Sequence, residues 1–323
     1  CHMKKLIILL PLFILASFSG SKKIKTDAET DQLKGKVKML KHETHYTYEK
    51  AGKVLVGEKV KGDGHNFVKF YNEKGYLTES TEYFLYSGPG EKKIFKYDGI
   101  GKLVEIKVYS LHDTLTCITT FKYDAKGNKI EKANNFQLGE KLIGKETWKY
   151  DLNGNNIQHD NYDFGGKVYM KWTYKYDGKG NKTNWNCFDA KGLDNGKYTY
   201  VYDENGRPIE MKKFEKDSRH DEIHAYEYDE KGNKIARTLT YPNKNRVEHE
   251  TWKYDEKGNM TEWKEEGALY RTYGYTYEYD SQGNWTKRTQ VENNYEEWNT
   301  KTKKMDYRDN VPVAIATRTI EYY

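Results

Sequence analysis

The chain lacks the features that mark several common protein classes. It has three cysteines among 323 residues, too few for a disulfide framework. Cys117 and Cys187 lie at different phases of the repeat described below, so we expect them to be free thiols. No block of five or six like charges is present, which excludes a typical nucleic-acid-binding arm. The P-loop, the Gly-x-Ser-x-Gly motif and Cys-x-x-Cys are also absent, so we expect no catalytic activity, cofactor or metal.

The chain is also too polar for a large dry core. Hydrophobic residues make up 36% of it and charged residues 32%, and the mean hydropathy is −1.05. Such polarity is typical of disordered chains when aromatic residues are scarce, but here 30 Tyr, 11 Phe and 7 Trp make up 15% of the sequence. Aromatic side chains therefore replace Leu and Val as the buried material, which suits a β-sheet that is wet on one face.

The N-terminus predicts export from the cytoplasm. Lys4 and Lys5 precede an apolar segment of about ten residues, which is too short to span a bilayer as a helix but typical of a secretory signal peptide. We therefore expect a signal peptide over residues 1–20, with Cys1 and His2 as additions ahead of the initiator Met3.

The end of this segment resembles a bacterial lipoprotein signal. It runs Ala16-Ser-Phe-Ser-Gly-Ser21, and Ser21 occupies the position of the cysteine that carries the lipid in such signals. If position 21 is natively cysteine, we expect an outer-membrane or cell-surface lipoprotein that meets the membrane only through this lipid. Otherwise we expect a secreted protein. Residues 21–43 are polar and show no period, which predicts a tether.

Residues 44–323 contain ten copies of a repeat of about 26 residues. Each copy has a tyrosine, followed in eight copies by Asp, and always a glycine four residues after the tyrosine. An acidic side chain that accepts backbone N–H bonds, two free positions and a glycine able to adopt positive φ predict a tight hairpin turn. The tyrosines are Tyr48, Tyr71, Tyr97, Tyr123, Tyr150, Tyr176, Tyr202, Tyr228, Tyr254 and Tyr279. The glycines are Gly52, Gly75, Gly101, Gly127, Gly154, Gly180, Gly206, Gly232, Gly258 and Gly283.

The residues around each turn predict two strands. Another aromatic residue lies two positions before the tyrosine in nine copies, and a β-branched residue lies seven positions after it in nine. A charged residue separates the two aromatic positions in seven copies, and this alternation is typical of a strand with one aromatic and one charged face. A four-residue Asp-x-x-Gly loop would put both aromatic positions and the β-branched residue on one face. A three-residue x-x-Gly loop would put the β-branched residue on the charged face, so we favour the four-residue loop.

Ten such hairpins in series predict an all-β fold. About twenty strands would form one long curled or spiral antiparallel sheet. Residues 316–323 copy the first half of a repeat, and we expect them to form a strand that caps the edge of this sheet.

The repeat resembles that of the YD-repeat (Rhs-repeat) family. The resemblance covers residues 46–290 and is carried by units such as Trp252-Lys-Tyr-Asp-Glu-Lys-Gly-Asn259. It implies a long antiparallel sheet coiled into a spiral or a hollow shell, which in the large members encloses a C-terminal toxin. Short extracytoplasmic YD-repeat lipoproteins are the closer likeness. The matched positions are structural, so the resemblance implies no catalytic residue.

Two functions agree with these features. The first is a scaffold or interaction protein of the cell envelope, with another envelope protein as its partner. The alternative is a glycan-binding module that uses aromatic rows of the sheet to bind a polysaccharide. Nucleic acid is not an expected partner. Candidate contacts are Trp185, Trp263 and Trp285 on returning strands, for which packing between repeats is the other possible role, and Tyr295 and Trp298 in the insertion at residues 292–310.

Overall fold

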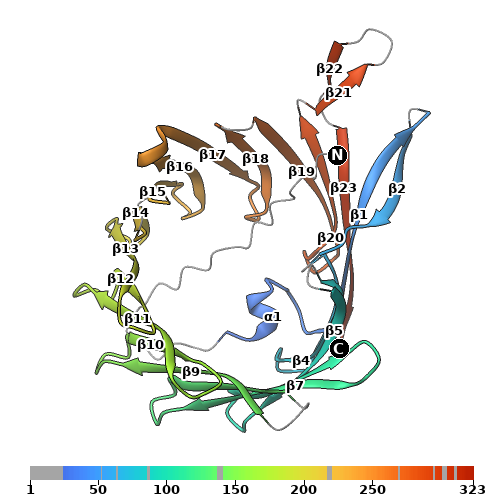
Figure 1. Ribbon diagram of the computed structural model, residues 1–323. Helices are drawn as coiled ribbons and strands as arrows, with labels where there is room; N and C mark the ends of the chain where they lie inside the picture. Colours follow the sequence, from blue (N-terminus) through green and yellow to red (C-terminus); the bar gives the residue numbers. More distant parts are fainter. Residues whose placement is uncertain are drawn as a thin grey trace.

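The computed structural model describes residues 25–51, 53–62, 65–85, 88–136, 141–216, 220–267, 270–293, 295–299, 304–308 and 311–323. Within these ranges the fold is all-β apart from two short helical segments, so the predicted fold class is confirmed at that level. Twenty of the strands form one closed antiparallel barrel (Figure 1).

The barrel closes because its first and last strands pair with each other. β1 (Val37–Lys50) pairs on one side with β3 (Asn66–Tyr71) and on the other with β23 (Val311–Tyr322), which also pairs with β20 (Trp285–Asn293). The predicted curled or spiral sheet is therefore wrong. The segment 316–323, predicted to cap an edge, lies almost entirely within β23, which pairs with β1 over residues 314–322 and with β20 over residues 311–317. Closure satisfies the backbone groups that two open edges would leave unpaired.

The other strands of the ring follow one another in sequence order, and each pairs with its neighbours along the chain. They are β4 (Leu77–Leu85), β5 (Gly88–Tyr97), β6 (Leu103–Ser110), β7 (Leu115–Tyr123), β8 (Lys129–Phe136), β9 (Lys141–Tyr150), β10 (Asn156–Tyr162), β11 (Val168–Tyr176), β12 (Lys182–Asp189), β13 (Asp194–Tyr202), β14 (Pro208–Phe214), β15 (Glu222–Tyr228), β16 (Lys234–Tyr241), β17 (Arg246–Tyr254), β18 (Met260–Glu266) and β19 (Arg271–Tyr279). A 3₁₀ turn, Pro242–Lys244, joins β16 to β17.

Two hairpins extend from the ring near the seam (Figure 1). β2 (Lys53–Lys59) pairs with the second half of β1. β21 (Tyr295–Asn299) and β22 (Lys304–Arg308) pair only with each other among the described strands, and they occupy the insertion between β20 and β23. The candidate residues Tyr295 and Trp298 therefore lie on β21, and their side chains are outside the described part of the structure.

The segment predicted to be a polar tether is folded over its described part. It forms a short helix, α1 (Asp27–Thr30), and the beginning of β1. Thr26 and Glu29 form a capping box at the helix start. Ala28 and Leu33 pack with residues of β1, β3 and β4 in the main buried hydrophobic cluster. The tether prediction is therefore wrong here, because four of its few apolar side chains, Ala28, Leu33, Val37 and Leu40, pack in this buried cluster. No helix in the described ranges is long and apolar enough to cross a membrane.

In nine copies the hairpin turn uses the three-residue loop, and the prediction of a four-residue loop is wrong. In the turn after Tyr176, the Asp177 N–H donates to the Asn181 carbonyl at 2.9 Å, and the Gly180 N–H donates to the Asp177 carbonyl at 3.0 Å. The Asp177 carboxylate accepts the N–H groups of Lys179 and Asn181. The predicted positive φ is confirmed at the nine repeat glycines within the described ranges, with values between +75° and +88°.

A β-bulge follows the turn in nine of the ten copies and changes the register of the returning strand. Tyr176 pairs with Lys182, but Tyr174 pairs with Trp185, so the β-branched Thr183 has no partner of its own. The three-residue loop places this β-branched position on the charged outer face, and the extra residue of the bulge shifts the rest of the returning strand by one position. At the same position Ile157 and Ile209 are 39% and 38% exposed. The residue nine positions after each tyrosine therefore shares the aromatic face.

The repeat tyrosines join each hairpin to the one before it. In seven consecutive copies the hydroxyl donates to a backbone carbonyl 20 or 21 residues earlier, over distances of 2.6 to 3.0 Å. We call this series the tyrosine ladder; its members are Tyr97, Tyr123, Tyr150, Tyr176, Tyr202, Tyr228 and Tyr254. Two other tyrosines continue it across the seam. Tyr322 donates to the Asp280 carboxylate at 2.5 Å, and Tyr323 donates to the Tyr71 carbonyl at 2.5 Å.

The turn geometry predicts a position-specific effect of valine. Gly232 and Gly178 both face open space, but only Gly232 has a positive φ, of +86°. Gly232→Val should lower the free energy of unfolding by roughly 1–3 kcal/mol, because a β-branched residue resists this conformation. Gly178→Val, at the free position of a turn, should change it little. Urea denaturation of both variants measures the difference. Equal stabilities would contradict the conformational role of the glycine.

Candidate functional site

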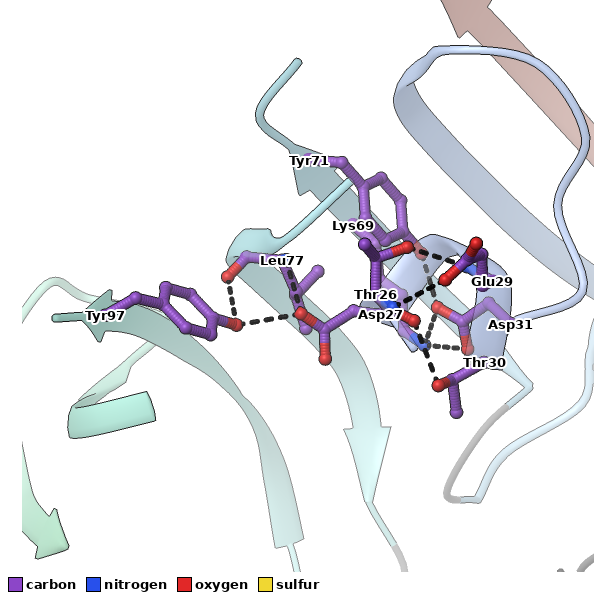
Figure 2. A network of polar contacts seen from close by, with 9 residues as sticks. All are labelled: Thr26, Asp27, Glu29, Thr30, Asp31, Lys69, Tyr71, Leu77 and Tyr97. Carbon is purple, nitrogen blue, oxygen red and sulfur yellow. Dashed lines mark hydrogen bonds and ion pairs between the residues drawn. The ribbon is translucent and has the colours of Figure 1, made fainter. Parts of the chain in front are cut away.

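The aromatic face of the sheet points into the barrel. The hydroxyls of Tyr71 and Tyr97 donate to the carboxylates of Asp31 and Asp27 (Figure 2), and α1 lies inside the ring in Figure 1. Alternate residues of a strand share a face, so the repeat tyrosines, the aromatic residues two positions earlier and their cross-strand partners form the inner wall. The charged residues between them point outward, and Lys122 and Lys253 expose 68% and 70% of their side chains.

Three adjacent strands bring three rings of the inner wall into one stack. His159 on β10 lies between Trp148 on β9 and Trp172 on β11, with ring centroids 4.9 and 4.8 Å away and interplanar angles of 8° and 20°. We call these three residues the aromatic stack. All three are only half-buried. On the next two strands Trp185 stacks on Tyr198 at 4.1 Å and 6°. The inner wall from β9 to β13 therefore carries an aromatic layer made of two stacks, one on β9 to β11 and one on β12 and β13.

Lysines six positions after the tyrosine also belong to this wall. The ammonium groups of Lys129, Lys182 and Lys234 lie 4.3, 4.5 and 4.8 Å from the ring centroids of Trp148, Tyr174 and Tyr226. Burial lowers the pKa of each of the three lysines, and the cation–π contacts offset part of the lost hydration. The sequence pattern did not predict these inward lysines, because a four-residue loop would have placed them on the outer face, whereas the three-residue loop pairs each of them with its repeat tyrosine.

Two carboxylates of the wall are paired with basic groups on neighbouring strands. Glu146 accepts from His159 Nε2 at 3.0 Å and from Lys132 Nζ at 2.8 Å. These bonds, that of His159 first, lower the pKa of Glu146 to about 2. Farther round the ring, Arg237 Nε lies 2.6 Å from Glu250 Oε2. Pairing of this kind is what permits partly buried charge in a wall of rings.

The tryptophans predicted as candidate contacts all lie on the inner wall, but the structure does not bring them together. Trp185 on β12 donates its Nε1 to the Tyr200 hydroxyl at 3.1 Å. Trp263 on β18 is 4% exposed and stacks on Tyr273, so packing is its evident role. Trp285 on β20 lies 3.7 Å below the Arg318 guanidinium.

The aromatic stack was missed as a candidate. Its signal in the sequence is the pair of positions two before and nine after the tyrosine, which only the bulge places side by side. Ser21, the position equivalent to the lipidated cysteine, lies outside the described residues.

Neither thiol nor metal chemistry marks a second site. Cys117 and Cys187 are free thiols, as expected from their different phases in the repeat. Across the described ranges, no group of three or more His, Cys, Asp or Glu side chains is arranged to hold a metal ion.

Among known proteins, this chain has only distant structural similarities. No protein-family model matches the chain, and no curated protein sequence matches it. A porin-like protein from Bacteroides uniformis is 12% identical over 89% of this chain and 99% of that protein, with a TM-score of 0.35. The Tc holotoxin pore of Photorhabdus luminescens is 14% identical, with a TM-score of 0.30, and a TcdB2–TccC3 complex is 13% identical, with a TM-score of 0.29. Each of these two matches covers 82% of this chain but only 16% of the toxin chain.

The tyrosines of the wall predict an alkaline limit to stability. Burial raises the pKa of Tyr174, Tyr176, Tyr202 and Tyr226 from 10.0 to about 12. A group whose pKa is raised by folding stabilises the native state fully at pH values below its pKa in the unfolded chain. This stabilisation is lost as the pH rises through its pKa in the folded state. The barrel should therefore stay folded at pH 9 and unfold cooperatively between about pH 10 and 12. Tyrosinate absorbance and circular dichroism should change together. Ionisation of most tyrosines near pH 10 with the sheet intact would contradict their burial.

Proposed function

We propose that this chain is a non-catalytic, extracytoplasmic binding protein built on YD repeats, and that it binds a polysaccharide along the inner wall of the barrel. The observation that carries the proposal is the aromatic layer on β9 to β13, with its half-buried stack of Trp148, His159 and Trp172. The N-terminal segment, with its signal-like sequence, supports a place in the cell envelope, held by a lipid if position 21 is natively cysteine.

A sugar chain suits this wall for two physical reasons. The apolar C–H faces of sugar rings pack on flat aromatic side chains, and hydroxyl groups need donors and acceptors close to those rings. The wall supplies both, because the stack adjoins Glu146 and Lys132, and Lys129 lies over Trp148. The repeat then presents similar chemistry on successive strands, which suits a ligand that is itself a repeating chain.

The scaffold function is favoured by a different surface. The hairpin of β1 and β2 exposes Tyr46, Tyr48, Val54 and Val56 by 46% to 58%, and the hairpin of β21 and β22 extends near it (Figure 1). Exposed hydrophobic side chains on a projecting hairpin are typical of a contact with another protein. We propose this surface as the docking point for an envelope protein if the inner wall has no ligand.

The polysaccharide proposal predicts that loss of one ring of the stack weakens binding. In affinity electrophoresis against neutral glucans, mannans and acidic polyuronates, the wild-type chain should be retarded by at least one polymer. Trp172→Ala should weaken retardation about tenfold, the effect of losing roughly 1.4 kcal/mol of stacking.

The control for this test is Tyr270→Ala. Tyr270 is an aromatic residue that is 77% exposed and precedes β19, so its replacement should leave retardation unchanged. Thermal unfolding of both variants verifies that each is folded. Absence of retardation by every polymer, or equal retardation of wild type and Trp172→Ala, would contradict the polysaccharide proposal and leave the scaffold function.

A further inference from the structure

A pocket of about 440 Å³ opens at the ends of β8, β9, β10 and β11 that lie away from the repeat turns. Its lining includes Asn134, Gly144, Glu146, Asn161, Tyr162 and Tyr169. Pockets of this size accommodate small ligands, and none of these residues was singled out by the repeat pattern. The pocket shares Glu146 with the aromatic stack, because this carboxylate accepts the hydrogen bond from His159.

The pocket exists because a side chain is missing from β9. Gly144 pairs with Asn134 of β8 and lies two positions before Glu146, so it belongs to the inner wall. A Cβ atom at this position would meet only the Asn134 amide nitrogen, at 3.5 Å. Gly144 has no positive φ, so the backbone does not require glycine. Glycine inside a strand weakens the strand and often marks a bulge or a place where a ligand or another backbone comes close; here β9 has a bulge next to Gly144, and the pocket opens at the same point.

The polar groups around the pocket alternate between donors and acceptors. The Asn134 Oδ1 accepts from the Thr119 hydroxyl at 2.8 Å, which leaves its amide N–H groups for the pocket. The Asn161 Oδ1 is buried and has no hydrogen-bond partner in the described structure. A buried acceptor without a partner costs free energy, and a hydroxyl donor from a ligand would satisfy it.

Of the three charged residues that line the pocket, Glu146 and Lys145 are in ion pairs, and the Asp163 carboxylate accepts backbone N–H groups of its own turn. Glu146 is paired with Lys132 and His159, and Lys145 is paired with Glu131 at 2.8 Å. An anionic ligand would therefore find Lys145 already paired, whereas a ligand with many hydroxyls can bond to the carboxamides, to the carboxylates and to the tyrosine hydroxyls. Tyr169, at the rim, is 46% exposed and offers a ring to one face of such a ligand.

We propose that this pocket is the specificity subsite of the protein, and that it holds one neutral sugar residue of the polysaccharide that lies on the aromatic stack. This inference rests on the proposed function. Glu146 connects the two parts, since it borders the pocket and holds His159 in the stack. The stack binds the chain through ring faces that most sugars share, and the pocket selects which sugar residue is accepted.

The test fills the pocket without touching the stack. Gly144→Leu should abolish the preference among neutral glucans and mannans and the binding of the disaccharides cellobiose and mannobiose, measured by saturation-transfer NMR. Retardation by the preferred polymer should fall but persist, because the stack is intact. Gly178→Leu is the matched control: Gly178 lies in a turn, faces open space and has an equivalent residue, Leu152, in another copy.

A second variant keeps the inference testable if Gly144→Leu does not fold. Tyr169→Ala removes a rim side chain that packs little, and it should weaken disaccharide binding while the thermal midpoint is unchanged. If Gly144→Leu folds and its sugar preference is unaltered, the subsite proposal is wrong and the polysaccharide function still stands. If Gly144→Leu does not fold, the same conclusion follows from an unaltered preference in Tyr169→Ala. Stronger binding of polyuronates than of neutral polymers overturns the neutral-sugar assignment. Absence of all sugar binding in the wild type overturns both proposals.

Discussion

The barrel depends on one repeated hydrogen bond, from the hydroxyl of each ladder tyrosine to a backbone carbonyl in the preceding hairpin. A hairpin alone is marginally stable in water, and this bond fixes its distance and register relative to its neighbour. It also orients the tyrosine ring inward, where it takes the place of an aliphatic core. The same bond type closes the ring, because Tyr323 donates to the Tyr71 carbonyl. Fold class, closure and the aromatic inner wall all follow from this contact.

Much of this could be predicted from the sequence, and the rest failed for identifiable reasons. The period of the tyrosines and turn glycines predicts the strands, the hairpins and the positive φ values, because those are local properties. The register prediction failed because it assumed that the β-branched position shares the aromatic face, and because a bulge at positions such as Thr183 is not visible in an alternating pattern. Closure of the barrel was not predicted, because the pairing between β1 and β23 is a contact between the two ends of the chain. The structure of the segment around α1 was not predicted, because its few apolar residues find partners only in the folded barrel.

The chemical kind of the candidate site could be predicted from the sequence, but the residues that form it could not. Aromatic rows were expected, and three tryptophans were named, but Trp263 proves to be fully packed. The half-buried stack of Trp148, His159 and Trp172 combines residues from two different repeats, brought together by pairing of β9, β10 and β11. The pocket beside it arises from the absence of a side chain at Gly144. Both features lie where individual copies depart from the average repeat, which is where a repeat protein can acquire specificity.

The most direct test of the closed, inward-facing barrel is a disulfide across its seam. Lys41 of β1 and Thr319 of β23 are paired residues, and paired Cα atoms of antiparallel strands lie about 4.5–5.5 Å apart, within disulfide range. With the native cysteines replaced by alanine, Lys41→Cys combined with Thr319→Cys should form an intramolecular disulfide rapidly under mild oxidation, as peptide mass mapping would show. A control pair, Lys41→Cys with Lys197→Cys on β13, should not. If the seam pair oxidises no faster than the control, the sheet is open and this account of the barrel is wrong.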